Sequence, residues 1–260
     1  MKTYRKLPKM LLIALLTLSL TLPALADTPD TPDTTGSTVS TTATGKETET
    51  LAFSDISGHW AEEVITKWKD KGIVNGYPDG TFKPDAPITR AELAKILSLA
   101  FELETPEEPK TFGDVAADSW YSGYVASTAD YIPTYCPPDL NEQTRPYEAK
   151  DSFLPDDTAL RIHAAGAFAA VKITHDGLTI EYPSIQDINK TVTGKFSDAE
   201  FQNLYVMHGS VADNVKKFQT DAWLALELGL MQGDPAGNFR PYDSLTRAEV
   251  LTILDRCTTE

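Results

Sequence analysis

Apolar side chains recur with the spacing of one helix face in three separate segments of the chain. Leu93, Ile96, Leu97 and Ala100 occupy positions i, i+3, i+4 and i+7. The same spacing returns in Ala164, Ala167, Phe168 and Val171, and again in Val250, Ile253, Leu254 and Cys257. This periodicity predicts three amphipathic α-helices, each with its apolar face towards a core.

A helix start precedes two of these apolar stripes. Thr89-Arg90-Ala91-Glu92 and Thr246-Arg247-Ala248-Glu249 have the form of a capping box, in which the Thr hydroxyl accepts a bond from the third helical amide and the Glu side chain reaches back. We therefore assign structural, helix-capping roles to Thr89, Glu92, Thr246 and Glu249. In the middle segment, Leu160 and His163 replace Thr and Glu while Arg161 remains, and Thr158 offers a cap for a slightly earlier helix start.

A shorter helix is predicted ahead of the first stripe. Trp60, Val64 and Trp68 recur every four residues, with Ile65 beside them, and Gly72 provides a stop. On this pattern we expect Trp60, and Trp120 in the next unit, to bury most of their surface in the core. Both indoles are still able to offer a part of their surface to a ligand, because Trp is rarely fully buried.

The chain contains three copies of one unit. Residues 76–84 align with residues 233–241 at a constant offset of 157, which continues through both capping boxes, and a degenerate copy around Phe153 and Arg161 lies at an offset of 71 from the first. The units open with Phe53-Ser54-Asp55, Phe112-Gly113-Asp114 and Phe196-Ser197-Asp198. One helix pair of this size buries too little apolar surface alone. We therefore expect an all-α fold, in which three helix-loop-helix repeats form a pseudo-threefold bundle with short irregular insertions.

The chain divides into six predicted segments. Residues 1–26 have the basic start and small-residue end of a secretory signal, and their 13-residue apolar run from Met10 to Leu22 is too short to span a membrane. Residues 27–50, rich in Thr, Ser and Pro, are expected to form a disordered linker. The repeats are placed at 51–106, 107–173 and 196–260, with an insertion in the second repeat at 140–152 and another between repeats at 174–195.

Charge restricts the partners of the exported part. Without residues 1–26 the formal charge is −19, which argues against nucleic acid and against an anionic membrane surface. The sequence has no nucleophile elbow, no His-Glu-x-x-His, no phosphate loop and no metal-ligand spacing. We therefore expect no enzyme activity, no cofactor and no metal. Cys257 occupies an apolar slot of its helix, and whether it pairs with Cys136 stays open.

Together these motifs resemble S-layer homology repeats. The resemblance rests on the opening Phe-x-Asp, the early Trp, the Gly-x-Pro-x-Gly-x-Phe-x-Pro stretch and the Thr-Arg-Ala-Glu motif, and it covers Phe53 to Cys257. It is strong in the first unit and in the latter half of the third, and weak in the second. The resemblance implies a secreted protein of the cell wall or surface layer. It also implies that grooves between repeats bind an anionic, commonly pyruvylated, secondary cell-wall polysaccharide or a modified peptidoglycan.

The candidate carbohydrate contacts combine this resemblance with simple chemistry. Arg90 and Arg247 lie in a first helical turn, where unpaired amides favour an anion and a guanidinium pairs with a carboxylate; the alternative is that they face water. Arg161 is a weaker third candidate. The others are Trp60 and Trp120 for a sugar ring, Asp55, Asp114 and Asp198 for sugar hydroxyls, and His59, Gly76 and Gly233. For the aspartates the alternative is a turn-stabilising role.

Two functions are kept side by side. The first is non-covalent anchoring to the bacterial cell wall by glycan binding. The second is a structural or adaptor role, in which the repeats bind other surface-layer proteins or peptidoglycan. In either case we expect a monomer whose three repeats form the pseudo-trimer. Its grooves are expected to be unequal, because the middle unit has lost its capping box.

Overall fold

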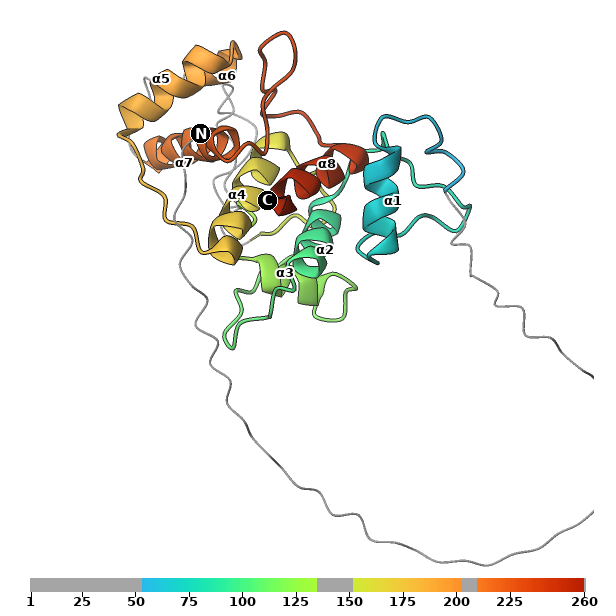
Figure 1. Ribbon diagram of the computed structural model, residues 1–260. Coiled ribbons are helices and arrows are strands. Elements are labelled where there is room, and N and C mark those ends of the chain that lie inside the picture. Colours follow the sequence, from blue (N-terminus) through green and yellow to red (C-terminus); the bar gives the residue numbers. More distant parts are fainter. Residues whose placement is uncertain (1–52, 135–151, 203–209, 260) are drawn as a thin grey trace, which may run out of the picture. The chain divides into compact units, whose positions relative to one another are not determined.

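The described part of the chain is helical. A computed structural model describes residues 53–134, 152–202 and 210–259, and in these ranges β-structure is limited to isolated bridges. The helices, labelled in Figure 1, are α1 Glu62–Asp70, α2 Arg90–Ala100, α3 Ser122–Thr128, α4 Arg161–Asp176, α5 Ile185–Lys195, α6 Ala199–Gln202, α7 Ser210–Glu227 and α8 Arg247–Thr258. The predicted all-α class is confirmed.

The three helices that carry the apolar stripes begin at the arginines. Capping boxes start α2 at Thr89 and α8 at Thr246, as predicted. Helix α4 starts at Arg161 with Leu160 at its N-cap and no side-chain cap. The earlier start that Thr158 offered is not used, because the Thr158 hydroxyl accepts a bond from Ser244 instead.

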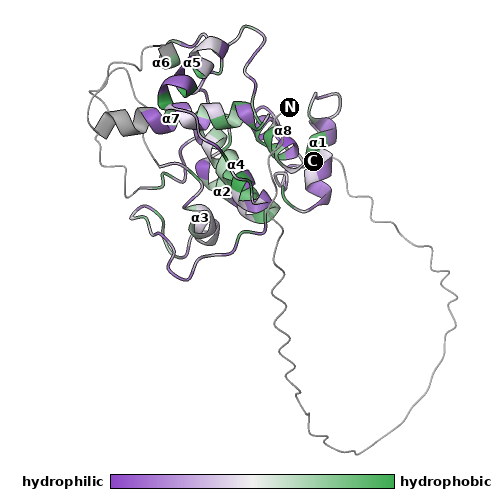
Figure 2. Cartoon of the chain, turned by 60° about the vertical axis from the view of Figure 1, so that its left-hand side comes forward, coloured by the Kyte–Doolittle hydropathy of each residue, from purple (hydrophilic) through white to green (hydrophobic). Residues whose placement is uncertain are grey.

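These stripes form most of the core. All of their residues are buried except Ala100, which is half-buried. Figure 2 shows hydrophobic colour along α4 and α8, whereas α1 is largely hydrophilic. Burial of the apolar faces of α2, α4 and α8 is the main source of stability in this part of the chain.

A closed set of backbone hydrogen bonds joins the segments that lead into these three helices. Ile88 N donates to Leu245 O (2.9 Å), Leu245 N to Ala159 O (2.9 Å), and Ala159 N to Ile88 O (2.8 Å). All three residues are fully buried. Each of the three segments therefore depends on both of the others for its buried backbone groups.

In each predicted repeat, the helix that precedes the arginine-starting helix packs on a helix of a different repeat. Helix α1 contacts α8, α3 contacts α2, and α7 contacts α4, while α4 also contacts α8 and α2. Each predicted repeat is thus a unit of sequence but not of packing, because one of its helices packs on a helix of another repeat. Sequence periodicity does not reveal this packing, because it gives the face of a helix and not its partner.

Two expectations about local structure are wrong. The Trp60 side chain is 63% exposed and that of Trp120 is 58% exposed, so neither is a core residue. Helix α1 begins only at Glu62, so Trp60 precedes it and does not share its periodicity; the buried residues of α1 are Ile65 and Trp68.

The second difference concerns the insertion at 174–195, which is not irregular. It contains the last turn of α4, which ends at Gly177 with φ of 61°, and the whole of α5, which is capped by Ser184. Ile188 and Val192 of α5 are buried, and α5 packs on α7. Cys136, the predicted signal and linker, and nearly all of the 140–152 insertion lie outside the described residues.

Gly76 is required by close packing. A β-carbon at this position would lie 2.6 Å from the carbonyl oxygen of Thr81 and would overlap the ring of Phe53. We expect Gly76→Ala to lower the free energy of unfolding by about 1–3 kcal/mol, because backbone and ring have to shift. Urea denaturation measures this loss. Gly113→Ala is the matched control, since open space surrounds Gly113, and an equal loss in both variants would contradict the packing argument.

Candidate functional site

The three opening aspartates each clamp a turn of their own repeat. The Asp55 carboxylate accepts bonds from the amides of Phe82 and Lys83, at 2.8 and 2.7 Å. Asp114 holds Phe153 and Leu154 in the same way, and Asp198 holds Phe239 and Arg240, with distances from 2.6 to 2.8 Å. This is the turn-stabilising alternative considered from the sequence. Burial raises the pKa of Asp55, but the amide bonds outweigh it and hold the pKa below its ordinary value.

The second residue of each clamped pair has a left-handed backbone. Lys83, Leu154 and Arg240 have φ of 58°, 57° and 55°. This region is unfavourable for residues other than glycine, so the aspartate bonds hold a strained conformation. The clamp therefore fixes the direction in which the side chains of Lys83 and Arg240 leave the turn.

The three motif arginines join the repeats. The Nε atom of each donates to the carbonyl oxygen of a buried phenylalanine in another unit: Arg90 to Phe153, Arg161 to Phe239 and Arg247 to Phe82, at 2.7, 2.8 and 2.9 Å. All three arginines are buried. The amide groups that start α2, α4 and α8 are also engaged, because they donate to carbonyl oxygens of another repeat. These amides therefore do not form the vacant anion site that the sequence argument assumed.

Each arginine also contacts the residue at the capping-glutamate position of another repeat. Arg161 Nη1 lies 3.0 Å from Glu249 Oε1, and Arg247 Nη1 lies 3.0 Å from Glu92 Oε1. Burial lowers the pKa of Arg161, and the charge of Glu249 opposes that shift. The capping glutamates thus have a second, inter-repeat role that the capping-box pattern does not reveal.

His163 takes the glutamate position in the middle repeat. Arg90 Nη1 lies 3.0 Å from His163 Nδ1. Because arginine only donates hydrogen bonds, His163 Nδ1 is the acceptor and carries no proton. The sequence alignment already placed His163 in register with Glu92 and Glu249, and that register was the available signal for this role.

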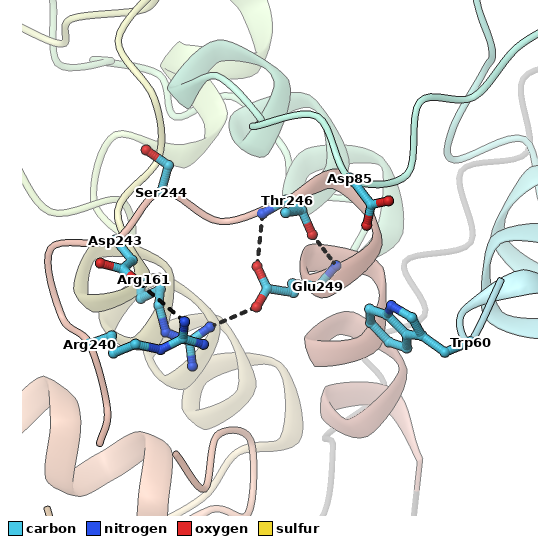
Figure 3. A pocket seen from close by; sticks show the side chains of 8 residues that line it. All are labelled: Trp60, Asp85, Arg161, Arg240, Asp243, Ser244, Thr246 and Glu249. Carbon is cyan, nitrogen blue, oxygen red and sulfur yellow. Dashed lines mark hydrogen bonds and ion pairs between the residues drawn. The ribbon is translucent and has the colours of Figure 1, made fainter. Parts of the chain in front are cut away.

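A cleft of about 260 Å³ opens among segments of all three predicted repeats, and we call it the Trp60 cleft. Its lining residues are Trp60, Asp85, Arg161, Arg240, Asp243, Ser244, Thr246 and Glu249. Figure 3 shows Arg161, Arg240 and Asp243 on one side, Trp60 and Asp85 on the other, and Glu249 and Thr246 between them. The cleft therefore combines an exposed aromatic face with charges of both signs.

The cleft contains only part of the predicted site. Trp60 and Arg161 were candidates for carbohydrate contact, and Thr246 and Glu249 were assigned to capping. The cleft is not lined by Arg90, Arg247, Gly76, Gly233 or the three opening aspartates. Trp120 does not line it either, and its indole makes an edge-to-face contact with Tyr121 and a tilted one with Tyr124. Sequence reasoning missed Asp85, Asp243 and Ser244, which lie between the turn and the capping box. It also missed Arg240, which lies within the turn at a position that is Lys83 in the first repeat and Leu154 in the second.

His59 does not line the cleft but contacts two of its lining residues. Its Nε2 atom lies 3.2 Å from Asp85 Oδ1, and its ring lies 5.3 Å from that of Trp60. The Ala61 amide donates to His59 Nδ1 at 3.1 Å, so the proton is on Nε2, which donates to Asp85. His59 thus couples the position of the Asp85 carboxylate to that of the indole.

The described residues lack two kinds of feature, a metal-binding cluster and a membrane-spanning helix. They contain no group of three or more His, Cys, Asp or Glu side chains able to hold a metal ion. Within the same residues, no helix is both long and apolar enough to cross a membrane.

Comparison with known proteins places this sequence near proteins of bacterial surfaces. Residues 52–94 and 224–251 match the family model of the S-layer homology domain. Over 78 residues, 30% of this chain, it is 41% identical to Cell surface glycoprotein 1 of Acetivibrio thermocellus, of which the match covers 3%.

Longer alignments exist at lower identity. The chain is 26% identical over 204 residues to an S-layer protein of Bacillus licheniformis, covering 78% of this chain and 19% of that protein. It is 25% identical over 216 residues to Exoglucanase XynX of Acetivibrio thermocellus, covering 81% of this chain and 17% of the enzyme. The chain thus spans less than a fifth of the length of each of these relatives, which include both a surface-layer protein and an enzyme.

Proposed function

We propose that this protein, which carries S-layer homology sequence in residues 52–94 and 224–251, is a secreted surface protein that anchors non-covalently to the bacterial cell wall. Its ligand is an anionic secondary wall polysaccharide, in which pyruvyl ketals supply the acid. The shared sequence with surface proteins supports the cellular location. The chemistry of the Trp60 cleft supports a glycan as the ligand.

The observation that carries this proposal is an exposed indole in the wall of a charged cleft. Burial of a tryptophan stabilises a fold, and Trp60, which is 63% exposed, gives up most of this stabilisation. A role in ligand binding explains why such a large apolar side chain stays exposed. A flat aromatic face packs against the apolar face of a sugar ring. The cleft of about 260 Å³ has room for a sugar unit or two beside this face.

Arg240 is the proposed contact for the acidic group. Its side chain is 47% exposed, and its ion pairs with Asp234 and Asp243 are long, at 3.6 and 3.4 Å. Exposed pairs of this kind contribute little, so a ligand carboxylate is able to replace them. Arg161 lies at the same side of the cleft, where it is ion-paired with Glu249.

The other candidate residues have an indirect or a weaker role in binding. Arg90 and Arg247 act indirectly, by holding the repeats that form the cleft. Trp120 provides a second and weaker sugar contact, because its indole is also exposed and Lys95 Nζ lies 6.0 Å from its ring centre.

Co-sedimentation with purified cell walls that contain pyruvylated polysaccharide tests this function. We expect the protein to pellet with these walls and to stay in solution after the polysaccharide has been removed by hydrofluoric acid. If removal changes nothing, peptidoglycan or a wall protein is the ligand. If the protein does not pellet with intact walls, wall anchoring is excluded.

Trp60→Ala tests the cleft itself. Because a central aromatic contact contributes about 1.4 kcal/mol or more to binding, we expect at least tenfold weaker wall binding. The unfolding free energy should change little, since the side chain is mostly exposed. Tyr182→Ala is the matched control: Tyr182 is 57% exposed but does not line the cleft. Equal binding by wild type and Trp60→Ala would contradict the proposed site.

A further inference from the structure

The charges of the Trp60 cleft do not fit a purely acidic ligand. Two guanidinium groups and three carboxylates line it, so the lining has an excess of negative charge. Arg161 and Glu249 are already bonded to one another, and their side chains are 11% and 29% exposed. The charges most available to a ligand are Arg240, Asp243 and, above all, Asp85, whose side chain is 81% exposed.

Asp85 and Trp60 lie on the same side of the cleft (Figure 3), and His59 contacts both. One of its oxygens accepts the Nε2 proton of His59, and the His59 ring lies 5.3 Å from that of Trp60. The remaining acceptor positions of Asp85 are open to a ligand because the side chain is so exposed. A carboxylate beside an indole is the arrangement that attracts an organic cation, by ion pairing and by the cation–π interaction.

We infer that the Trp60 cleft binds a sugar unit that carries a free primary ammonium group, so that the wall glycan is zwitterionic. This inference rests on the proposed glycan binding. The ammonium of a de-N-acetylated amino sugar pairs with Asp85 beside Trp60, while the acidic group of the same or the next sugar faces Arg240. Figure 3 shows these two ends on opposite sides of the cleft. A glycan is favoured over a basic peptide because the flat indole also packs on a sugar ring.

The test compares two soluble probes by isothermal titration calorimetry at physiological salt: chitohexaose, in which each sugar is N-acetylated, and its fully de-N-acetylated counterpart. We expect the de-N-acetylated probe to bind about five- to tenfold more tightly, because its ammonium group gains a cation–π contact and an ion pair with the adjacent carboxylate. Asp85→Asn should abolish this preference. It should not disturb folding, because Asp85 is 81% exposed.

Asp118→Asn is the matched control, since Asp118 is an exposed aspartate outside the cleft. It should keep the full preference, and this separates the cleft from a general attraction of cations to an acidic protein. Equal affinity for both probes, or a preference that survives in Asp85→Asn, overturns the inference. Trilysine that binds as tightly as the de-N-acetylated probe, with the same dependence on Asp85, also overturns it.

Failure of this inference is distinguishable from failure of the proposed function. If wild type pellets with intact walls while the two probes bind equally, anchoring stands and the ammonium site is wrong. If wild type does not pellet with walls, the anchoring proposal itself is wrong, whichever probe binds.

Discussion

Arg161→Met is expected to lower the free energy of unfolding by about 3–5 kcal/mol, because it leaves a part-buried carboxylate without its guanidinium and a buried carbonyl without its donor. Glu249 loses the guanidinium at 3.0 Å, and the buried carbonyl of Phe239 loses its donor at 2.8 Å. Methionine retains much of the apolar stem, so the loss reflects the polar contacts. Urea denaturation followed by circular dichroism measures it.

Lys67→Met provides the control for this experiment. Lys67 is paired with Asp255, but the Lys67 side chain is 43% exposed, against 11% for Arg161, so we expect a loss below about 1 kcal/mol. A loss in Arg161→Met as small as that in Lys67→Met would show that the motif arginine is not a structural link between repeats. Its main role would then have to be ligand contact.

Asp198→Ala is the second substitution with a large expected effect. It leaves the amides of Phe239 and Arg240 without an acceptor and releases the clamp on the left-handed backbone of Arg240. We expect a loss of about 3 kcal/mol, because hydrogen bonds to charged groups contribute about 1.5–3 kcal/mol each and part of this is recovered by water. Thermal and urea denaturation both measure the change.

The first repeat supplies an internal comparison. Asp55 makes the same two bonds, but it is exposed, whereas Asp198 is buried. Water replaces the lost acceptor more easily at the exposed position, so Asp55→Ala should cost less than Asp198→Ala. The reverse order would contradict the clamp as the source of the effect.

The sequence predicts the inner helices well because their signals are local. The i, i+3, i+4, i+7 spacing identified the buried faces of α2, α4 and α8, and the capping boxes located the starts of α2 and α8. Both signals depend on residues within two turns of one another. The start of α4 at Arg161 followed from alignment with the other repeats, without any cap of its own.

The candidate site is predicted less well because it depends on contacts between repeats. The sequence placed Arg90, Arg161 and Arg247 on first turns, but the direction of each guanidinium is set by a carbonyl in another repeat. Trp60 was assigned to the core because a period of four includes it. That period does not apply, since α1 starts two residues later.

Asp85 and Arg240 illustrate the remaining difficulty. Asp85 follows the turn of the first repeat and corresponds to Tyr242 in the third, whereas Arg240 lies within the turn of the third repeat and corresponds to Lys83. Only the packing of the first and third repeats brings them into one cleft. The chemistry of this cleft therefore combines a basic position that two repeats share with Asp85, at a position where the repeats differ.

The packing of α1 on α8 also determines when the fold can be completed. Lys67 of α1 and Asp255 of α8 are ion-paired although 188 residues separate them. Such contacts stabilise the chain only after a very long loop has closed, so they form late in folding. Helix α1 is synthesised well before α8, so Ile65 and Trp68 lack this packing surface until α8 has also been made. A chain that stays incompletely folded during synthesis suits the export that we propose for it.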